Sequence, residues 1–337
     1  MLKLGFIGCG GIARHHAKTI QNSVKGLRIA AGADVSADAR KLFGETFHCS
    51  NMMDDYRDLL KTDIDAVCVA LPTGLHADAV VAAAQAGKHV FCEKPMAMNL
   101  RDCDRMIAAC DKARVKLMIG QVRRYDAYWG TFKKLMDSGA VGRPVLWRQC
   151  VASSGPGRWF MDAKLGGGPF IDGCVHNWDF ANYCFGEPVE AIGSLMRVYQ
   201  KSALDTGAMI VRYKSGDEIA LSWSWGMPQG CRAGRVHEAL GPKGVIQFPE
   251  CITPEELPKD LDSQKHGVFM VDLGAKKRFV KYSKKTNMFA EEWKDFLGAV
   301  EKNREPKVTG AIGRKAAAVA IAVLKAGETR KPVKIQA

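Results

Sequence analysis

A glycine-rich turn near the start of the chain restricts the possible folds more than any other feature. Its residues, Gly8-Cys9-Gly10-Gly11-Ile12-Ala13, fit the pattern G-x-G-x-x-G/A. The turn follows the apolar run Leu2–Ile7 and opens a helical stretch that reaches about Ile20. In this context the pattern is typical of a dinucleotide-binding unit, because glycines let the backbone approach a pyrophosphate at a helix N-terminus. The sequence therefore predicts that these six residues bind a dinucleotide.

An acidic residue closes the second predicted strand, Leu27–Val35. Asp34 lies about 20 residues after the turn, where a carboxylate can accept a hydrogen bond from the adenosine ribose. A carboxylate there would repel a 2′-phosphate, so NAD is favoured over NADP. Ser36 and Arg40 are close enough in sequence to accommodate a phosphate, so NADP stays an alternative.

The first third of the chain alternates strand and helix signals. Ala66–Leu71, Val90–Cys92 and Val115–Gly120 are short apolar runs, as expected of buried parallel strands. Helical stretches follow Ser36 and Asn99, both good N-cap residues. This alternation predicts an α/β fold with a doubly wound parallel sheet.

After Gln121 the pattern changes. Several strands with little helix between them are expected between about residues 191 and 248, and Lys214–Asp217 has the composition of a hairpin turn. Two helices and a short strand close the chain. We therefore expect a Rossmann domain at residues 1–121 and a second α/β domain at residues 122–337, with an open mixed, largely antiparallel sheet.

The chain is strongly basic for its 337 residues. Its formal net charge is +13, of which residues 1–121 contribute +3 and residues 122–337 contribute +10. Such a surplus suits nucleic acid, a membrane surface, an anionic substrate or a merely solvated surface. The basic run from Lys276 to Lys285 fits no nucleic-acid motif and is better explained as a charged strand edge. No apolar run approaches the ~20 residues that span a bilayer. We therefore expect neither nucleic acid nor membrane as a partner.

Cysteine usage indicates a cytoplasmic protein. The eleven cysteines are scattered without a C-x-x-C, and Cys68 and Cys92 lie in apolar runs where cysteine acts as a small hydrophobe. The N-terminus leads directly into the glycine turn and shows no signal peptide. His237, Cys231 and Cys251 lack the spacing of metal ligands, so no metal site is expected.

Three polar residues follow the glycine triplet Gly166–Gly168. Asp172, His176 and Asp179 stand at i, i+4 and i+7 of a predicted helix that ends at Phe185, and so share one face. A neutral histidine suits the general base of alcohol oxidation, and a neighbouring aspartate can orient its ring. We therefore predict His176 as acid/base and Asp172 as its orienting partner. The alternative is a helix histidine with a structural ion-pair partner.

Lys94 follows the strand Val90–Cys92, at the strand end that faces the ligand crevice of a doubly wound sheet. Its ammonium group could stabilise alkoxide charge on a reacting hydroxyl. We therefore predict an electrostatic catalytic role for Lys94.

With these residues the chain resembles the Gfo/Idh/MocA family of oxidoreductases, and inositol dehydrogenases in particular. The resemblance extends over nearly the whole chain and is clearest in residues 1–185. It rests on the glycine turn, Leu71-Pro72-Thr73-Gly74-Leu75-His76, Ala86-Gly87-Lys88-His89-Val90-Phe91-Cys92-Glu93-Lys94-Pro95, Gly120-Gln121-Val122-Arg123-Arg124-Tyr125-Asp126, and the segment that holds Gly166–Gly168, Asp172, His176 and Asp179.

The resemblance implies an NAD(P)-dependent dehydrogenase that acts on a cyclitol, a sugar, a sugar acid or a nucleotide sugar. It also implies a second domain that often forms a homo-oligomer, here a dimer or tetramer. By position, the residues near the cofactor would be Pro72, Thr73, His76, Glu93 and Lys94. Those that touch substrate would be Lys94, Arg123, Asp172, His176 and Asp179.

Two other functions remain open within this fold. Some relatives use bound NAD transiently to cleave glycosides, and others are non-catalytic regulators that bind a dinucleotide. The regulators tend to lose the lysine or histidine, whereas this chain keeps Lys94, Asp172 and His176. The positive charge of the second domain is a weak pointer towards an anionic sugar.

Overall fold

The computed structural model describes residues 1–199, 202–231 and 233–337. The chain divides into two compact units. The first comprises residues 1–122 and 288–317, and the second comprises residues 123–287 and 318–337. Sequence analysis expected two continuous domains, whereas residues 288–317 return to the first unit. The return is driven by packing, because the indole ring of Trp293 stacks on Phe91 in the first unit with ring centroids 4.3 Å apart.

The first unit contains a six-stranded parallel sheet with the order β3-β2-β1-β4-β5-β6. Every residue of β4 and β6 is buried, which explains their continuous apolar runs. The predicted doubly wound sheet is confirmed. Its strands are β1 (Leu2–Ile7), β2 (Leu27–Ala33), β3 (Met52–Met53), β4 (Ala66–Val69), β5 (His89–Glu93) and β6 (Leu117–Gly120).

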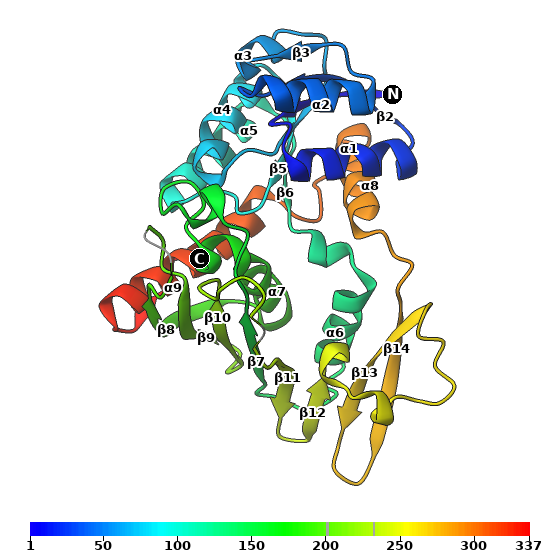
Figure 1. The fold of residues 1–337 in the computed structure, drawn as a ribbon, viewed down its shortest axis with the longest axis vertical. Helices are drawn as coiled ribbons and strands as arrows, with labels where there is room; N and C mark the ends of the chain where they lie inside the picture. Colours follow the sequence, from blue (N-terminus) through cyan, green and yellow to red (C-terminus); the bar gives the residue numbers. More distant parts are fainter. Residues whose placement is uncertain (200–201, 232) are drawn as a thin grey trace. The chain divides into compact units, whose positions relative to one another are not determined.

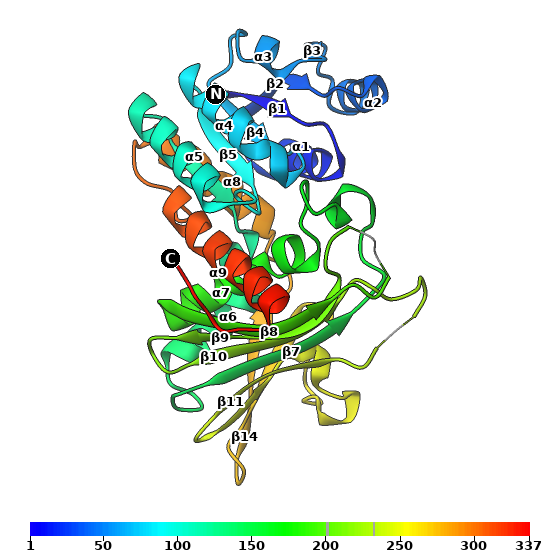
Figure 2. The ribbon, with the colours of Figure 1, turned by 90° about the vertical axis from the view of Figure 1, so that its left-hand side faces the viewer.

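Helices cover both faces of this sheet (Figure 2). Helix α1 contacts α2 and α8, and α4 packs on α5. Both predicted N-caps are present: the Ser36 hydroxyl accepts from the Ala39 N–H, and the Asn99 side chain accepts from the Asp102 N–H. The helices of this unit are α1 (Gly11–Ser23), α2 (Ala37–Phe47), α3 (Tyr56–Leu59), α4 (His76–Gln85), α5 (Leu100–Ala113), α8 (Met288–Glu301) and the first part of α9 (Gly310–Thr329).

The second unit contains a nine-stranded mixed sheet with the order β14-β13-β12-β11-β7-β10-β9-β8-β15. Only β7 and β10 pair in parallel, and the other neighbours are antiparallel. The predicted mixed, largely antiparallel sheet is therefore confirmed. Its strands are β7 (Leu146–Ala152), β8 (Pro188–Met196), β9 (Thr206–Tyr213), β10 (Glu218–Ser224), β11 (Val236–Gly241), β12 (Gly244–Gln247), β13 (His266–Asp272), β14 (Lys277–Ser283) and β15 (Val333–Lys334).

Two helices of this unit, α6 (Ala127–Asp137) and α7 (Val175–Phe185), pack against each other (Figure 1). The core contains closely spaced aromatic rings, among them Phe132, Trp147 and Phe248. Strand β14 forms one edge of the sheet and carries part of the basic run, as expected of a charged edge.

The helix that carries the predicted catalytic pair is not one regular α-helix. Pro169–Gly173 forms a π-helical turn, in which the Cys174 N–H donates to the Pro169 carbonyl, and α7 begins only at Val175. A π turn places more residues in each turn than an α-helix, so Asp172 and His176 do not have plain i, i+4 spacing. Such turns are frequent at functional sites.

Within the described ranges, no helix has both the length and the apolar character needed to cross a membrane.

A buried acid lies in the core of the first unit. Glu292 of α8 is fully buried, and neither carboxyl oxygen has a hydrogen-bond partner in the part of the chain that the structure describes. Burial raises the pKa of Glu292 well above its ordinary value, and the charges of Glu93 and Asp295 raise it further. Glu292 is therefore a neutral carboxylic acid in the folded protein at neutral pH.

The proton that Glu292 retains on folding makes the unfolding free energy depend on pH. The folded state retains the Glu292 proton while the unfolded chain loses it above about pH 4.5. Between about pH 4.5 and the raised pKa of the folded state, Glu292 by itself lowers the unfolding free energy by about 1.4 kcal/mol per pH unit. Glu292→Gln cannot ionise, so we expect it to melt with the parent near pH 4.5 and at a higher temperature than the parent at pH 7–8. Thermal unfolding followed by circular dichroism across this range measures the difference.

The control is Glu291→Gln, because Glu291 is the exposed neighbour of Glu292. It should follow the parent curve at every pH. Equal melting of Glu292→Gln and the parent at pH 8 would show that Glu292 is not a buried neutral acid.

Candidate functional site in two units

The glycine turn leaves open space where a dinucleotide needs it. Gly8 has φ +92°, and a Cβ there would lie 2.5 Å from the Ala70 carbonyl oxygen, so only glycine fits. A Cβ on Gly10 or Gly11 would meet no atom within 4 Å. Helix α1 begins at Gly11 without a side-chain cap, so its first N–H groups remain available to an anion. These features fit a bound pyrophosphate.

Asp34 holds the turn in place. Its Oδ2 accepts from the Cys9 N–H at 2.8 Å, and its Oδ1 accepts from the Ser36 N–H at 2.9 Å. Each carboxylate oxygen has further lone pairs that can accept ribose hydroxyls. Arg40 directs Nη1 to the Asp34 and Val35 carbonyls. Arg40 and the capping Ser36 are thus already engaged by backbone groups, which favours NAD over NADP.

The turn after β4 contributes a buried hydroxyl and a buried imidazole. Thr73 follows Pro72 in a short 3-10 turn, and its hydroxyl has no hydrogen-bond partner among the residues that the structure describes. His76 is fully engaged, because Nδ1 lies 2.9 Å from the Pro95 carbonyl oxygen and Nε2 lies 2.8 Å from that of Leu71. Thr73 is therefore suited to contact a ligand, whereas His76 joins two backbone segments.

Glu93 and Lys94 stand at the end of β5. Glu93 is buried, and both its oxygens are engaged: Oε1 lies 2.6 Å from His16 Nε2, and Oε2 accepts from the Lys94 N–H at 3.0 Å. Lys94 is half-buried, and its peptide bond to Pro95 is cis. The predicted cofactor contact of Glu93 stays a prediction, and the geometry gives this carboxylate an internal role.

Sequence analysis left His16 out of the site. The structure places it, fully buried, between Glu93 and Trp293, whose indole Nε1 donates to His16 Nδ1 at 2.9 Å. The available signal was a polar residue on the buried face of α1, beside Ala13 and Ala17. Trp293 carried no such signal, because it lies more than 270 positions further along the chain.

The second unit holds the other predicted residues. Asp172 is buried in the π turn, and His176 is half-buried in the first turn of α7. Asp179 is buried and forms a two-pronged ion pair with Arg124, with Nε–Oδ2 and Nη2–Oδ1 distances of 2.8 Å. The predicted contact between Asp179 and substrate is not tested, and the carboxylate already has this structural partner.

Arg123 differs from the ion-paired Arg124 in its contacts. Its guanidinium lies over the Trp129 ring, 4.2 Å from the centroid. Its Nη1 is buried and has no hydrogen-bond acceptor within the described ranges. Burial lowers the pKa of Arg123 to about 10. A buried guanidinium nitrogen without an acceptor suits an oxygen of a ligand.

The glycine triplet serves packing rather than access for a ligand. A Cβ on Gly166 would lie 2.6 Å from the backbone of Phe160, and one on Gly168 would lie 2.7 Å from the Leu204 carbonyl oxygen. Gly168 also has φ +74°. Close packing at Gly166 and Gly168 and the positive φ of Gly168 therefore account for these two glycines.

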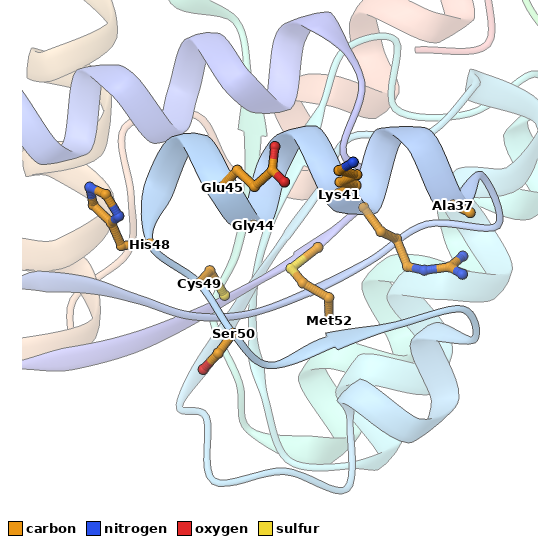
Figure 3. Close-up of a pocket in the computed structure, with 9 residues that line it drawn as sticks. Ala37, Lys41, Gly44, Glu45, His48, Cys49, Ser50 and Met52 are labelled. Atoms are coloured by element: carbon orange, nitrogen blue, oxygen red, sulfur yellow. The ribbon is translucent and has the colours of Figure 1, made fainter.

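A surface pocket lies along α2 (Figure 3). None of the predicted cofactor or substrate residues lines it, so it does not enter the candidate site. Its lining residues are Ala37, Arg40, Lys41, Gly44, Glu45, His48, Cys49, Ser50 and Met52. No group of three or more potential metal ligands occurs in the described part of the chain.

Models of known protein families match segments of both units. Residues 2–121 match the model of an oxidoreductase family with an NAD-binding Rossmann fold, and residues 129–247 match the GFO/IDH/MocA C-terminal domain. The chain is 30% identical to myo-inositol 2-dehydrogenase of Thermotoga maritima and 27% identical to inositol 2-dehydrogenase of Rhizobium meliloti, with 99% of each chain covered in both cases.

A solved structure gives the same result. The aldose-aldose oxidoreductase of Caulobacter crescentus, complexed with glycerol, superimposes with a TM-score of 0.82 at 27% identity and 99% coverage of each chain. The first unit is thus an NAD-binding domain, and its open glycine turn and Asp34 fit that cofactor. The chain belongs to the GFO/IDH/MocA family of NAD-binding oxidoreductases.

Proposed function

We propose that this chain oxidises a secondary hydroxyl of a cyclitol or sugar, with NAD as hydride acceptor. The observation that carries the proposal is the position of Lys94. It follows β5 directly at the carboxyl edge of an NAD-binding sheet, in a chain that also retains Asp172 and His176. The similarity to inositol dehydrogenases over 99% of the chain supports the substrate class.

The proposed chemistry assigns one task to each side chain. His176 takes the hydroxyl proton on a ring nitrogen as the carbonyl forms. Asp172 orients the ring and stabilises its charged form. Lys94 donates a hydrogen bond to the reacting oxygen and stabilises negative charge there. Bound NAD supplies the acceptor for the hydride that leaves the carbon.

The substrate class can be narrowed by charge. Arg123 has a buried nitrogen without an acceptor among the described residues, and residues 122–337 carry a net charge of +10. Both features suit a substrate with an anionic group, such as a sugar acid or a nucleotide sugar, whereas the similarity to inositol dehydrogenases suits an uncharged cyclitol. A screen of inositols, aldoses, sugar acids and nucleotide sugars, with NAD and NADP in parallel, separates these options. Release of an aryl leaving group from a glycoside without net NAD reduction would instead indicate the glycosidase alternative.

We also propose a cytoplasmic homo-oligomer. The described cysteines are all free, and most are buried. Two apolar side chains on β8, Val189 and Met196, are exposed on the isolated chain and could be covered in an oligomer.

Removal of the catalytic groups tests the mechanism. His176→Ala and Lys94→Ala should each lower turnover about 10²- to 10⁴-fold, because each removes a group that acts on the transition state. The measurement is the rate of NADH formation with a substrate from the screen. Lys61→Ala removes an exposed lysine of the same unit and should leave the rate unchanged. Near-parental turnover in both variants would refute the assignment.

Substitution of Asp34 tests whether this carboxylate selects NAD over NADP. Asp34→Ser removes a charged acceptor worth about 1.5–3 kcal/mol, so NADH affinity should fall roughly 10- to 150-fold, while the affinity for NADPH rises relative to it. Quenching of tryptophan fluorescence by each nucleotide measures both affinities. Asp38→Ser alters an exposed acid in the first turn of α2 and serves as the control. An unchanged ratio of the two affinities would show that Asp34 does not select the cofactor.

A further inference from the structure

A cluster of buried polar side chains contacts the backbone of Lys94 in the first unit. We define it as His16 of α1, Glu93 of β5 and Trp293 of α8. His16 and Trp293 are fully buried, and Glu93 is 6% exposed. These residues come from three elements that are distant in sequence, and the hydrogen bonds among them are between 2.6 and 2.9 Å. The cluster ends at the backbone of the predicted catalytic lysine, because Glu93 accepts from the Lys94 N–H.

The direction of each hydrogen bond follows from the donors available. An indole N–H can only donate, so His16 Nδ1 must accept from Trp293 and carry no proton. The proton of the neutral ring is then on Nε2, which donates to Glu93 Oε1. Trp293 thus determines the tautomer of His16, and His16 determines where one oxygen of Glu93 lies.

The surrounding residues make room for this carboxylate. Glu93 pairs with Gly120 in the register of β5 and β6, and a Cβ on Gly120 would lie 3.2 Å from Glu93 Oε1. Phe91, whose Cζ would lie 3.4 Å from the same Cβ, stacks on Trp293 and forms an edge contact with His16. The cluster is therefore held by shape as well as by hydrogen bonds.

The cluster contains a single negative charge. Burial opposes ionisation of Glu93, whereas the hydrogen bonds from His16 and the Lys94 N–H and the positive charge of Lys94 favour it. The nearby Glu292 retains its proton, because burial and the charge of Glu93 raise its pKa. Two neighbouring buried carboxyl groups avoid mutual repulsion when only one ionises. The ionised one contacts Lys94.

We propose that Glu93 is a positioning residue for Lys94, and that His16 and Trp293 hold its carboxylate in place. The carboxylate holds the backbone at the end of β5 through the Lys94 N–H and places a negative charge beside this residue. Removal of the carboxylate frees the Lys94 N–H from its acceptor and takes a negative charge away from the neighbourhood of this lysine. The inference rests on the proposed function only in that it makes Lys94 the group whose position matters.

The chemical reactivity of Lys94 tests the proposal without cofactor or substrate. The folded full-length protein is treated with an amine-reactive acetylating reagent between pH 7 and 10, and Lys94 labelling is followed by peptide mass spectrometry. Glu93→Gln should label about tenfold faster than the parent near pH 8, since Lys94 loses both a neighbouring negative charge and the acceptor that fixes its backbone. His16→Leu should also label faster, and His16→Gln should restore the parental rate, because its amide can donate to Glu93.

Glu292→Gln is the matched control, because it changes a neighbouring acid that carries no charge. It should label within about twofold of the parent, and the exposed Lys61 should label equally in all variants. Circular dichroism confirms that each variant is folded, and His16→Leu provides a second test if Glu93→Gln does not fold. Equal labelling of Lys94 in the parent and in folded Glu93→Gln or His16→Leu would overturn the proposal.

The pH profile of turnover separates this inference from the proposed function. Glu93→Gln should shift the profile, whereas a merely structural change would lower the rate at every pH. Faster labelling in a protein that oxidises no tested substrate would keep the inference and refute the dehydrogenase. Loss of turnover in Lys94→Ala together with unchanged labelling in Glu93→Gln would keep the dehydrogenase and refute the inference.

Discussion

The first unit depends on parallel strands that end at one edge of a buried sheet. β1, β4 and β5 are neighbours in the sheet and run in the same direction. The segments that follow them, beginning at Gly8, Ala70 and Lys94, therefore emerge at the same edge. Strands covered on both faces cannot slip in register without exposing apolar side chains. The glycine turn, the Thr73 hydroxyl and Lys94 owe their positions to this constraint.

Four carboxyl groups, three in the first unit and one in the second, are stabilised by their own partners or by a retained proton. Asp34 receives two backbone N–H groups and so connects the glycine turn to the start of α2. Glu93 receives a histidine and a backbone N–H, while Glu292 remains neutral by keeping its proton. In the second unit Asp179 is neutralised by Arg124. Asp34 and Glu93 accept hydrogen bonds from backbone N–H groups of the first unit. Asp179 has an ion-pair partner, and Glu292 keeps its proton.

Much of the architecture could be predicted because it follows from local rules. Leu2–Ile7 was predicted to the residue, and the caps at Ser36 and Asn99 form as expected. The features that sequence patterns did not predict depend on packing between residues that are distant in the chain. Strand β13 lies in a segment without a clear alternating pattern, and the π turn before α7 depends on contacts of the glycine triplet with Phe160 and Leu204. Neither the strand nor the π turn can be predicted from the pattern of neighbouring residues.

The sequence by itself determined the dinucleotide turn and the two kinds of sheet, and it supplied the candidate residues Lys94, Asp172 and His176. Short-range patterns encode these features: glycine where φ is positive, apolar runs where strands are buried, and Lys94 directly after a strand. Only the tertiary structure showed that His16 and Trp293 support Glu93, and that Asp179 is paired with Arg124. Such partners are chosen by which helices pack on which sheet face, and no local pattern records that choice.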